Sequence, residues 1–175
     1  MGKNKSIILL LILLSLMTIV FLSVRAHTPK ITDIGGTVQD FDLVDPNNNR
    51  TKLSDMKGSV VFLNFWATWC ASCVEELPYV EKLFRAFAGN SSFRMVTILY
   101  KDNPQQALNF MKQTGYTFPI YLNPDESASK YFGLTGVPET FIIDKKGVLR
   151  TKVLGPAEWD SPQSVALLQS LMQEP

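Results

Sequence analysis

The chain has 175 residues, of which 46% are apolar and 19% charged, and its 17 basic and 16 acidic residues give a net charge of +1. This length fits one domain with a short additional segment. No basic stripe or arginine-rich arm is present that could neutralise phosphates, so a nucleic-acid-binding protein is excluded. Two cysteines are too few for a disulfide-stapled scaffold.

An uncharged apolar segment opens the chain. Residues 7–22 read IILLLILLSLMTIVFL and follow Lys3 and Lys5. As a helix of about 1.5 Å rise per residue, the uncharged stretch 6–24 would cover roughly 28 Å, which is close to the thickness of the bilayer hydrocarbon. We therefore expect residues 1–26 to be a membrane anchor. The alternative is a secretory signal that is cleaved near Val24-Arg25-Ala26.

The basic residues before this segment set its expected orientation. Lys3 and Lys5 favour a cytoplasmic N-terminus, so the rest of the chain crosses the membrane whether or not the segment is cleaved. Residues 27–32 are expected to form a short tether and residues 33–175 a single domain. Removing Lys3, Lys5 and Arg25 leaves 14 basic and 16 acidic residues, a net charge of −2. The expected location is extracytoplasmic, either on a single-pass N-terminal anchor or secreted after cleavage.

The first elements expected after the tether are a hairpin and a buried strand. Residues 37–44 alternate apolar and polar in part, and Pro46-Asn47-Asn48-Asn49 is a strong turn signal before residues 50–53. Residues 60–65, VVFLNF, form a nearly continuous apolar run. Such a run predicts a central strand buried on both faces.

Helices and strands then alternate to the end of the chain. A helix is predicted over residues 70–87, with one apolar face made by Cys73, Leu77, Val80, Phe84 and Phe87. Further strands are predicted over 93–100, 118–122, 139–143 and 148–154, and further helices over 104–114, 125–132 and from the N-cap Ser161 onward. This order predicts a mixed α/β sheet with helices on both faces.

The run FWATWCASC, residues 65–73, carries the chemistry. A buried strand ends, a short loop follows, and a C-x-x-C pair opens a helix. Cys70 lies nearest the unpaired N–H groups and the positive end of the helix dipole, so we expect it to have the lower pKa and to attack a substrate disulfide. Cys73, one turn further in and more buried, is expected to resolve the mixed disulfide. Trp69 is expected to shield the pair.

Two other roles for the cysteine pair are weighed against this one. A loop with two residues between the sulfurs adds little stability by chain closure. Zinc or iron–sulfur binding needs more ligands, and the one histidine, His27, lies next to the apolar segment. We therefore expect no metal and no cofactor, and a Cys70–Cys73 disulfide that is redox-active.

Four motifs identify a family resemblance. They are LSDMKG (53–58), NFWATWCASC (64–73), ELP (76–78) and GVPETF (136–141). On these motifs, over roughly residues 33–172, the sequence resembles the extracytoplasmic thioredoxin-like proteins of the TlpA/ResA type, which include the CcmG (DsbE) reductases of cytochrome c maturation. The resemblance implies a thioredoxin fold with an N-terminal β-hairpin extension and a central αβ insertion, and the activity of a protein disulfide reductase.

The same resemblance implies further site residues. Pro138 matches the family's cis-proline beside the cysteines, and Val137 would contact the substrate. Glu76 matches an acidic residue that assists proton transfer at the buried cysteine. Glu139 is a further residue expected to position the substrate, with the alternative that it is simply solvated.

For Glu76 the residues leave a second interpretation open. A carboxylate three residues beyond Cys73 could accept its proton. Glu75 and Glu76 could instead merely complement the helix N-terminus.

Partners and the direction of electron flow also follow from the resemblance. It implies a reductant of disulfide-bearing extracytoplasmic proteins, apocytochrome c among them, which is re-reduced by a membrane thiol-reductant donor protein. The dipeptide Ala71-Ser72 replaces a pair that often contains proline, and local chemistry leaves a thiol oxidant open. A peroxidase would need threonine at Ala67, and a copper chaperone would need a C-x-x-x-C with a distant histidine.

Overall fold

The computed structural model describes residues 3–26 and 33–175, and within the first range it describes the side chains of residues 7–8 and 10–21. The chain divides into two compact units, Met1–Lys30 and Ile31–Pro175. The expected tether over residues 27–32 lies outside the described residues.

The first unit contains one helix, α1 (Lys3–Ala26). Its two polar side chains in the described part are satisfied within the helix, because the hydroxyls of Ser15 and Thr18 donate to carbonyls one turn earlier. Among the residues with described side chains, no helix is long and apolar enough to cross a membrane. The uncharged stretch 6–24 that predicts an anchor extends beyond those side chains.

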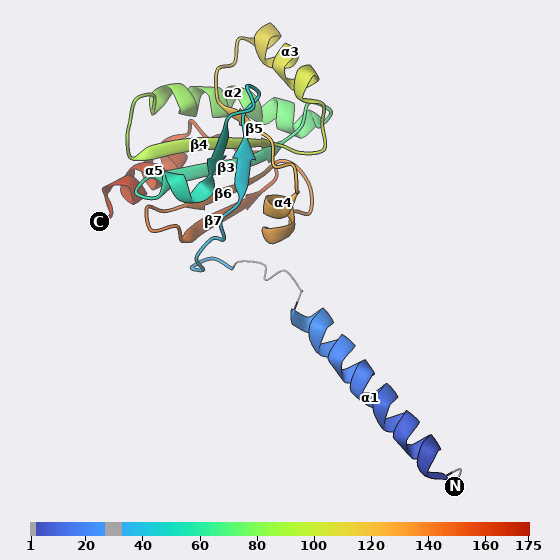
Figure 1. The fold of residues 1–175 in the computed structure, drawn as a ribbon. Helices are drawn as coiled ribbons and strands as arrows, with labels where there is room; N and C mark the ends of the chain where they lie inside the picture. The colour runs from blue at the N-terminus through green and yellow to red at the C-terminus, as the bar shows by residue number, and fades with distance from the viewer. Residues whose placement is uncertain (1–2, 27–32) are drawn as a thin grey trace. The chain divides into compact units, whose positions relative to one another are not determined.

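The second unit is built on a five-stranded sheet of order β5-β4-β3-β6-β7 (Figure 1). Its strands are β3 (Val60–Trp66), β4 (Phe93–Leu99), β5 (Ile120–Tyr121), β6 (Glu139–Ile143) and β7 (Leu149–Leu154). The central strand β3 runs parallel to β4 and antiparallel to β6. β4 also runs parallel to β5, so the carboxyl ends of β3, β4 and β5 share one edge of the sheet.

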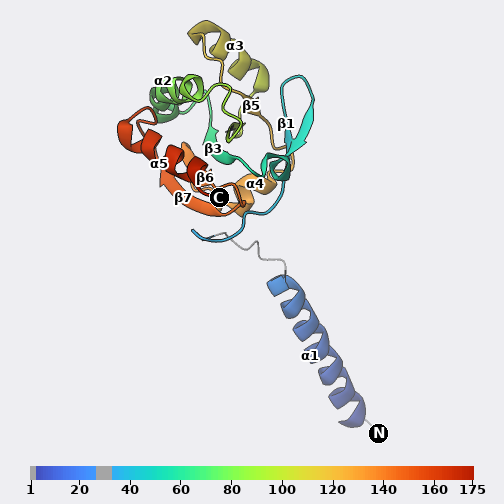
Figure 2. The ribbon, with the colours of Figure 1, turned by 90° about the vertical axis from the view of Figure 1, so that its left-hand side faces the viewer.

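Helices and a small hairpin cover this sheet. The helices are α2 (Ala71–Ala86), α3 (Pro104–Thr114), α4 (Ser127–Tyr131) and α5 (Pro162–Gln173). The hairpin pairs β1 (Asp42–Val44) with β2 (Arg50–Lys52) and leads into a short 3₁₀ helix, η1 (Leu53–Met56). Figure 2 shows α2 and α5 on one side of the sheet and the hairpin and α4 on the other.

Alternate side chains of β3 enter two apolar layers. Val60, Phe62 and Trp66 pack with α2, α3 and α5. Val61, Leu63 and Phe65 pack with η1, α4 and the start of the domain. All seven residues of β3 are buried, as the continuous apolar run predicts. Asn64 lies between Phe62 and Trp66 in sequence, so the same alternation aims it at α2.

The expected thioredoxin fold is confirmed, with the hairpin before it and an αβ insertion, α3 and β5, between β4 and α4. Two elements differ from the sequence-based expectation. The strand expected over 118–122 is reduced to Ile120–Tyr121. Pro119 has no N–H to donate to a ladder before it, and Leu122 after it pairs with Val44 of the hairpin. The segment leading to β3 contains the unexpected η1, whose Leu53 and Met56 are buried.

Candidate active site

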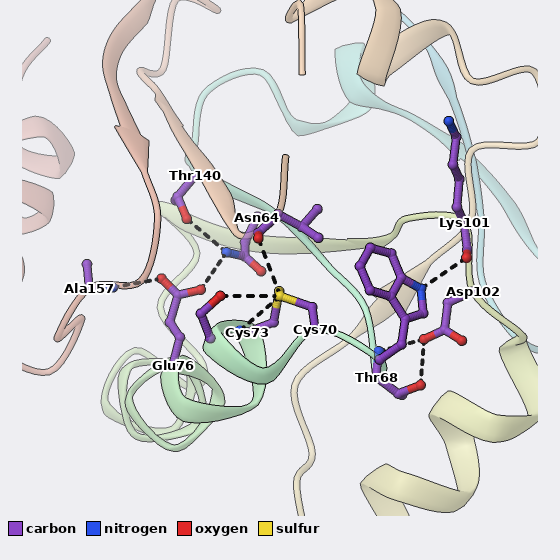
Figure 3. Close-up of a disulfide and its surroundings, with 12 residues drawn as sticks. Asn64, Thr68, Cys70, Cys73, Glu76, Lys101, Asp102, Thr140 and Ala157 are labelled. Carbon is purple, nitrogen blue, oxygen red and sulfur yellow. Dashed lines mark hydrogen bonds between the residues drawn. A yellow bond between two sulfur atoms is a disulfide. The ribbon is translucent and has the colours of Figure 1, made fainter. Parts of the chain in front are cut away.

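Cys70 and Cys73 lie where β3 delivers the chain to the N-terminus of α2, and they form a disulfide (Figure 3). Cys70 is the N-cap of α2, and its Sγ accepts a hydrogen bond from the Cys73 N–H at 3.1 Å. Cys70 is 7% exposed and Cys73 fully buried. The expectation that Cys73 is the more buried of the two is confirmed.

The loop before β6 lies against the Cys70 sulfur. The Val137–Pro138 peptide bond is cis, as the resemblance implies. The Val137 carbonyl oxygen lies 3.3 Å from Cys70 Sγ, and the Ser72 hydroxyl lies 3.5 Å from the same sulfur. After reduction, the Val137 carbonyl is therefore an acceptor within reach of the Cys70 thiol.

Glu76 lies one turn beyond Cys73 and is 1% exposed. Its Oε1 accepts from the Trp159 indole N–H at 2.6 Å and from the Ala157 backbone N–H at 3.1 Å. Its Oε2 accepts from the Asn64 amide at 3.1 Å. All three donors are uncharged, so nothing in direct contact neutralises the carboxylate.

Burial raises the pKa of Glu76 above its ordinary value of 4.5, and the three hydrogen bonds oppose this only in part. The alternative that Glu76 complements the helix N-terminus is wrong, because the first turn of α2 contains no acidic residue and Glu76 points into the core. Glu75 is exposed. A buried carboxyl with a raised pKa, on the same helix face as Cys73, is suited to proton transfer.

Glu139 lies at the start of β6 and is 2% exposed, so the alternative of a solvated acid is wrong. Its Oε1 accepts from the Thr135 N–H and hydroxyl and from the Gly136 N–H, at 2.6–3.2 Å. Its Oε2 lies 3.2 Å from Lys152 Nζ. Glu139 therefore holds the loop that precedes the cis peptide bond.

A turn after β4 holds the loop before Cys70. Asp102 Oδ2 accepts from the Thr68 N–H at 2.6 Å and from its hydroxyl at 2.7 Å (Figure 3). The Trp69 indole N–H donates to the Lys101 carbonyl at 3.1 Å. The Trp69 side chain remains 59% exposed, beyond the carboxyl end of β3.

Sequence reasoning missed three residues of this site, namely Asn64, Asp102 and Trp159. Asn64 gives a signal in hindsight, because it is the one polar residue in the apolar run VVFLNFW. Asp102 and Trp159 give none, since they reach the site from loops that are distant in sequence. Within residues 3–26 and 33–175, no group of three or more metal-ligating side chains is found.

The chain is similar in sequence to known proteins of one family. The family model described as Redoxin matches residues 33–168. The thiol-disulfide oxidoreductase ResA of Bacillus subtilis is 33% identical over 148 residues, which are 85% of this chain and 82% of that protein. ResA of Geobacillus thermodenitrificans is 32% identical over 154 residues, 86% of each chain.

Solved structures agree with this comparison. The exposed lipoprotein thioredoxin Etrx1 of Streptococcus pneumoniae is similar, with a TM-score of 0.61 and 26% identity over 78% of this chain and 100% of that one. A thiol:disulfide interchange protein of Chlorobium tepidum has the same fold, with a TM-score of 0.67 and 23% identity over 80% of this chain and 99% of that one.

Proposed function

The chain belongs to the Redoxin family and is a thioredoxin-like thiol–disulfide oxidoreductase, and we propose that it acts as a reductant of disulfides in extracytoplasmic partner proteins. One observation carries the proposal: a helix-capping disulfide, Cys70–Cys73, lies one turn from Glu76, a buried carboxyl without a cationic partner. The redox centre is the cysteine pair itself, so the proposal requires no cofactor.

The first step is nucleophilic attack by Cys70. In the dithiol form, the Cys70 thiolate is stabilised by the Cys73 N–H and the other free N–H groups of the first turn of α2. It attacks one sulfur of the substrate disulfide. A bond forms between Cys70 Sγ and that sulfur, and the other substrate sulfur leaves as a thiolate.

The second step is resolution by Cys73. The Glu76 carboxylate accepts the Cys73 proton, and the resulting thiolate attacks Cys70 Sγ. The bond between Cys70 and the substrate breaks, and the second substrate sulfur leaves and takes up a proton. Starting from the Cys70 thiolate and the Cys73 thiol, the enzyme pair has given two electrons and one proton to the substrate, which leaves the Cys70–Cys73 disulfide. A thiol donor protein at the membrane is needed to reduce it again.

The substrate chain is proposed to lie across the loop that ends at Pro138. Val137 would contact it, and Glu139 acts on it indirectly by holding residues 135–136. The exposed Trp69 offers an apolar surface on the other side of Cys70. These roles agree with the family resemblance of residues 136–141.

The location and partners belong to the same proposal. The uncharged residues 6–24 after Lys3 and Lys5 support a single-pass anchor that places the domain on the periplasmic side of a bacterial-type membrane. Disulfides persist in that compartment. We propose apocytochrome c as a partner on the basis of the ResA/DsbE resemblance.

Single-cysteine variants test the division of labour. Cys70→Ala is expected to abolish insulin reduction by the full chain, because the attacking thiolate is lost. Cys73→Ala is expected to accumulate mixed disulfides that mass spectrometry detects on Cys70. Ser170→Ala on the exposed face of α5, which keeps both cysteines, serves as the control and should retain reduction. Alkylation of Cys73 rather than Cys70 in the reduced wild-type chain would contradict the assignment.

The direction of electron flow is tested by the equilibrium of the cysteine pair with glutathione. A reductant is expected to have a potential near that of thioredoxin, about −270 mV. A value near that of DsbA, about −120 mV, would contradict the reductant assignment and favour an oxidant.

A further inference from the structure

Asn64 is fully buried in the middle of β3. Its Nδ2 donates to Glu76 Oε2 at 3.1 Å and to the Thr140 hydroxyl at 2.8 Å. Its Oδ1 is buried and has no hydrogen-bond partner among the described residues. A buried acceptor without a hydrogen-bond donor lowers the stability of the folded state, so the presence of a polar residue at this position needs an explanation.

The orientation of the amide is fixed by its neighbours. The Glu76 carboxylate requires a donor, which places Nδ2 on that side and Oδ1 on the other. Figure 3 shows the Asn64 amide between Glu76 and the disulfide, with its nitrogen toward Glu76. The alternation of β3 aims the same side chain at α2, whose first turn carries Cys73.

Reduction gives the cysteine pair hydrogen-bond donors that the disulfide lacks. In the disulfide neither sulfur carries a hydrogen, whereas in the dithiol Cys73 gains an S–H group. We propose that Asn64 is a positioning residue for the resolving step: Oδ1 accepts the hydrogen bond of the Cys73 thiol, while Nδ2 holds the Glu76 carboxylate ready for that thiol's proton. This inference rests on the proposed function and adds a residue to it.

Two consequences follow. The hydrogen bond to Oδ1 exists only in the dithiol form, so Asn64 stabilises that form relative to the disulfide. During resolution the Cys73 proton moves to Glu76 Oε2, and the new Cys73 thiolate attacks Cys70 Sγ. This step uses only the groups already named in the proposed mechanism. Asn64 itself neither gains nor loses a proton.

Asn64→Leu removes both polar ends of the side chain at similar volume. In the full chain held in detergent, we expect the equilibrium with dithiothreitol to shift toward the disulfide by about fivefold to tenfold, the worth of one net hydrogen bond. The resolving step, measured as loss of the mixed disulfide in single-turnover quench experiments, should also slow.

Asn64→Asp keeps the shape and an acceptor oxygen, so it tests the role of Asn64 even if the leucine variant does not fold. It places a second carboxyl 3.1 Å from Glu76 Oε2 in place of the amide donor. Two carboxyls at that distance share a proton, which raises the second of the two pKa values of the pair, the one at which the shared proton is lost. The midpoint of the pH profile of resolution should therefore move to higher pH.

The matched control is Thr97→Val. Thr97 is fully buried and pairs with Asn64 across β3 and β4. Its hydroxyl donates to the Pro119 carbonyl and accepts from the Trp66 indole N–H, and neither partner is a cysteine or Glu76. The Thr97→Val variant should lower the stability of the domain without changing the dithiothreitol equilibrium or the pH profile of resolution. If both Asn64 variants match Thr97→Val in redox equilibrium and pH profile, the inference is overturned.

The two proposals fail in different ways. If the wild-type chain does not reduce protein disulfides, the proposed function is wrong, yet the dithiothreitol equilibrium of the Asn64 variants still decides the role of Asn64. If the wild type is active and the Asn64 variants behave like it, the role of Asn64 alone is wrong.

Discussion

Two carboxylates are buried on helix α2, five residues apart, and they differ in their partners. Glu76 accepts hydrogen bonds from three uncharged donors, and burial raises its pKa. Glu81 is 5% exposed, and burial alone would raise its pKa as well. The backbone N–H groups of residues 117 and 118, the Thr117 hydroxyl and the Arg85 guanidinium donate to it, and together they lower its pKa.

The two carboxyls serve different purposes on the same helix. We call the part of α2 around Glu76 the chemical end and the part around Glu81 the structural end. Glu81 remains ionised and joins the middle of α2 to the segment that enters β5. Glu76 can take and release a proton, because no cation holds it in the charged form. Burial by itself therefore does not identify a catalytic carboxylate. The charge and number of its hydrogen-bond donors decide whether a buried carboxyl is held in the charged form.

The largest expected effect is on catalysis at the chemical end. Glu76→Gln should slow resolution of the mixed disulfide about 100-fold, since a positioned proton acceptor contributes at least this much. The free energy of unfolding should change little at neutral pH, because the removal of a desolvated charge offsets the loss of one acceptor oxygen for the three donors. Quench-flow kinetics and urea unfolding measure the two quantities. Unchanged resolution would refute the assignment of Glu76.

At the structural end the expected effect is on stability. Glu81→Ala should lower the free energy of unfolding by about 2–3 kcal/mol, because two backbone N–H groups lose their acceptor. Disulfide reduction per folded molecule should be unchanged. Arg85→Ala is the control. Its side chain is 63% exposed, so its loss should cost less than about 1 kcal/mol. A larger loss from Arg85→Ala than from Glu81→Ala would contradict this interpretation.

The two carboxyls should also give pH dependences of opposite sign. The folded-state pKa of Glu76 lies above 4.5, so its contribution to stability is full below the unfolded pKa and is lost as pH rises through the folded pKa. The folded-state pKa of Glu81 is lowered, so its contribution is present above the unfolded pKa and is lost as pH falls through the folded pKa. Urea unfolding of Glu76→Gln and Glu81→Gln between about pH 3 and pH 8 checks this. If the free energies of unfolding of the two variants depended on pH in the same way, the comparison would be contradicted.

The sequence was sufficient to predict most of the framework, because local signals are strong where the chain is regular. Pro104 at a helix start, Ser161 as an N-cap and the continuous run of β3 all predicted elements that are present. The C-x-x-C at the start of α2 located the redox centre for the same reason, since both cysteines belong to one helical turn.

The rest of the site depends on tertiary contacts that spacing does not encode. Trp159 reaches Glu76 across 83 positions, and Asp102 reaches Thr68 across 34. The burial of Glu139 depends on the pairing of β6 with β7, which places Lys152 beside it. Residues of this kind carry no periodic or motif signal of their own.

The central claim is that burial makes Glu76 easier to protonate than an ordinary carboxyl, while the donors around Glu81 hold it in the ionised form. Carboxyl ¹³C chemical shifts of the two residues, followed by NMR as the pH of the oxidised chain is varied, test it most directly. The account predicts that Glu76 titrates above pH 4.5 and Glu81 below it. Titration of Glu76 at or below the midpoint of Glu81 would contradict it.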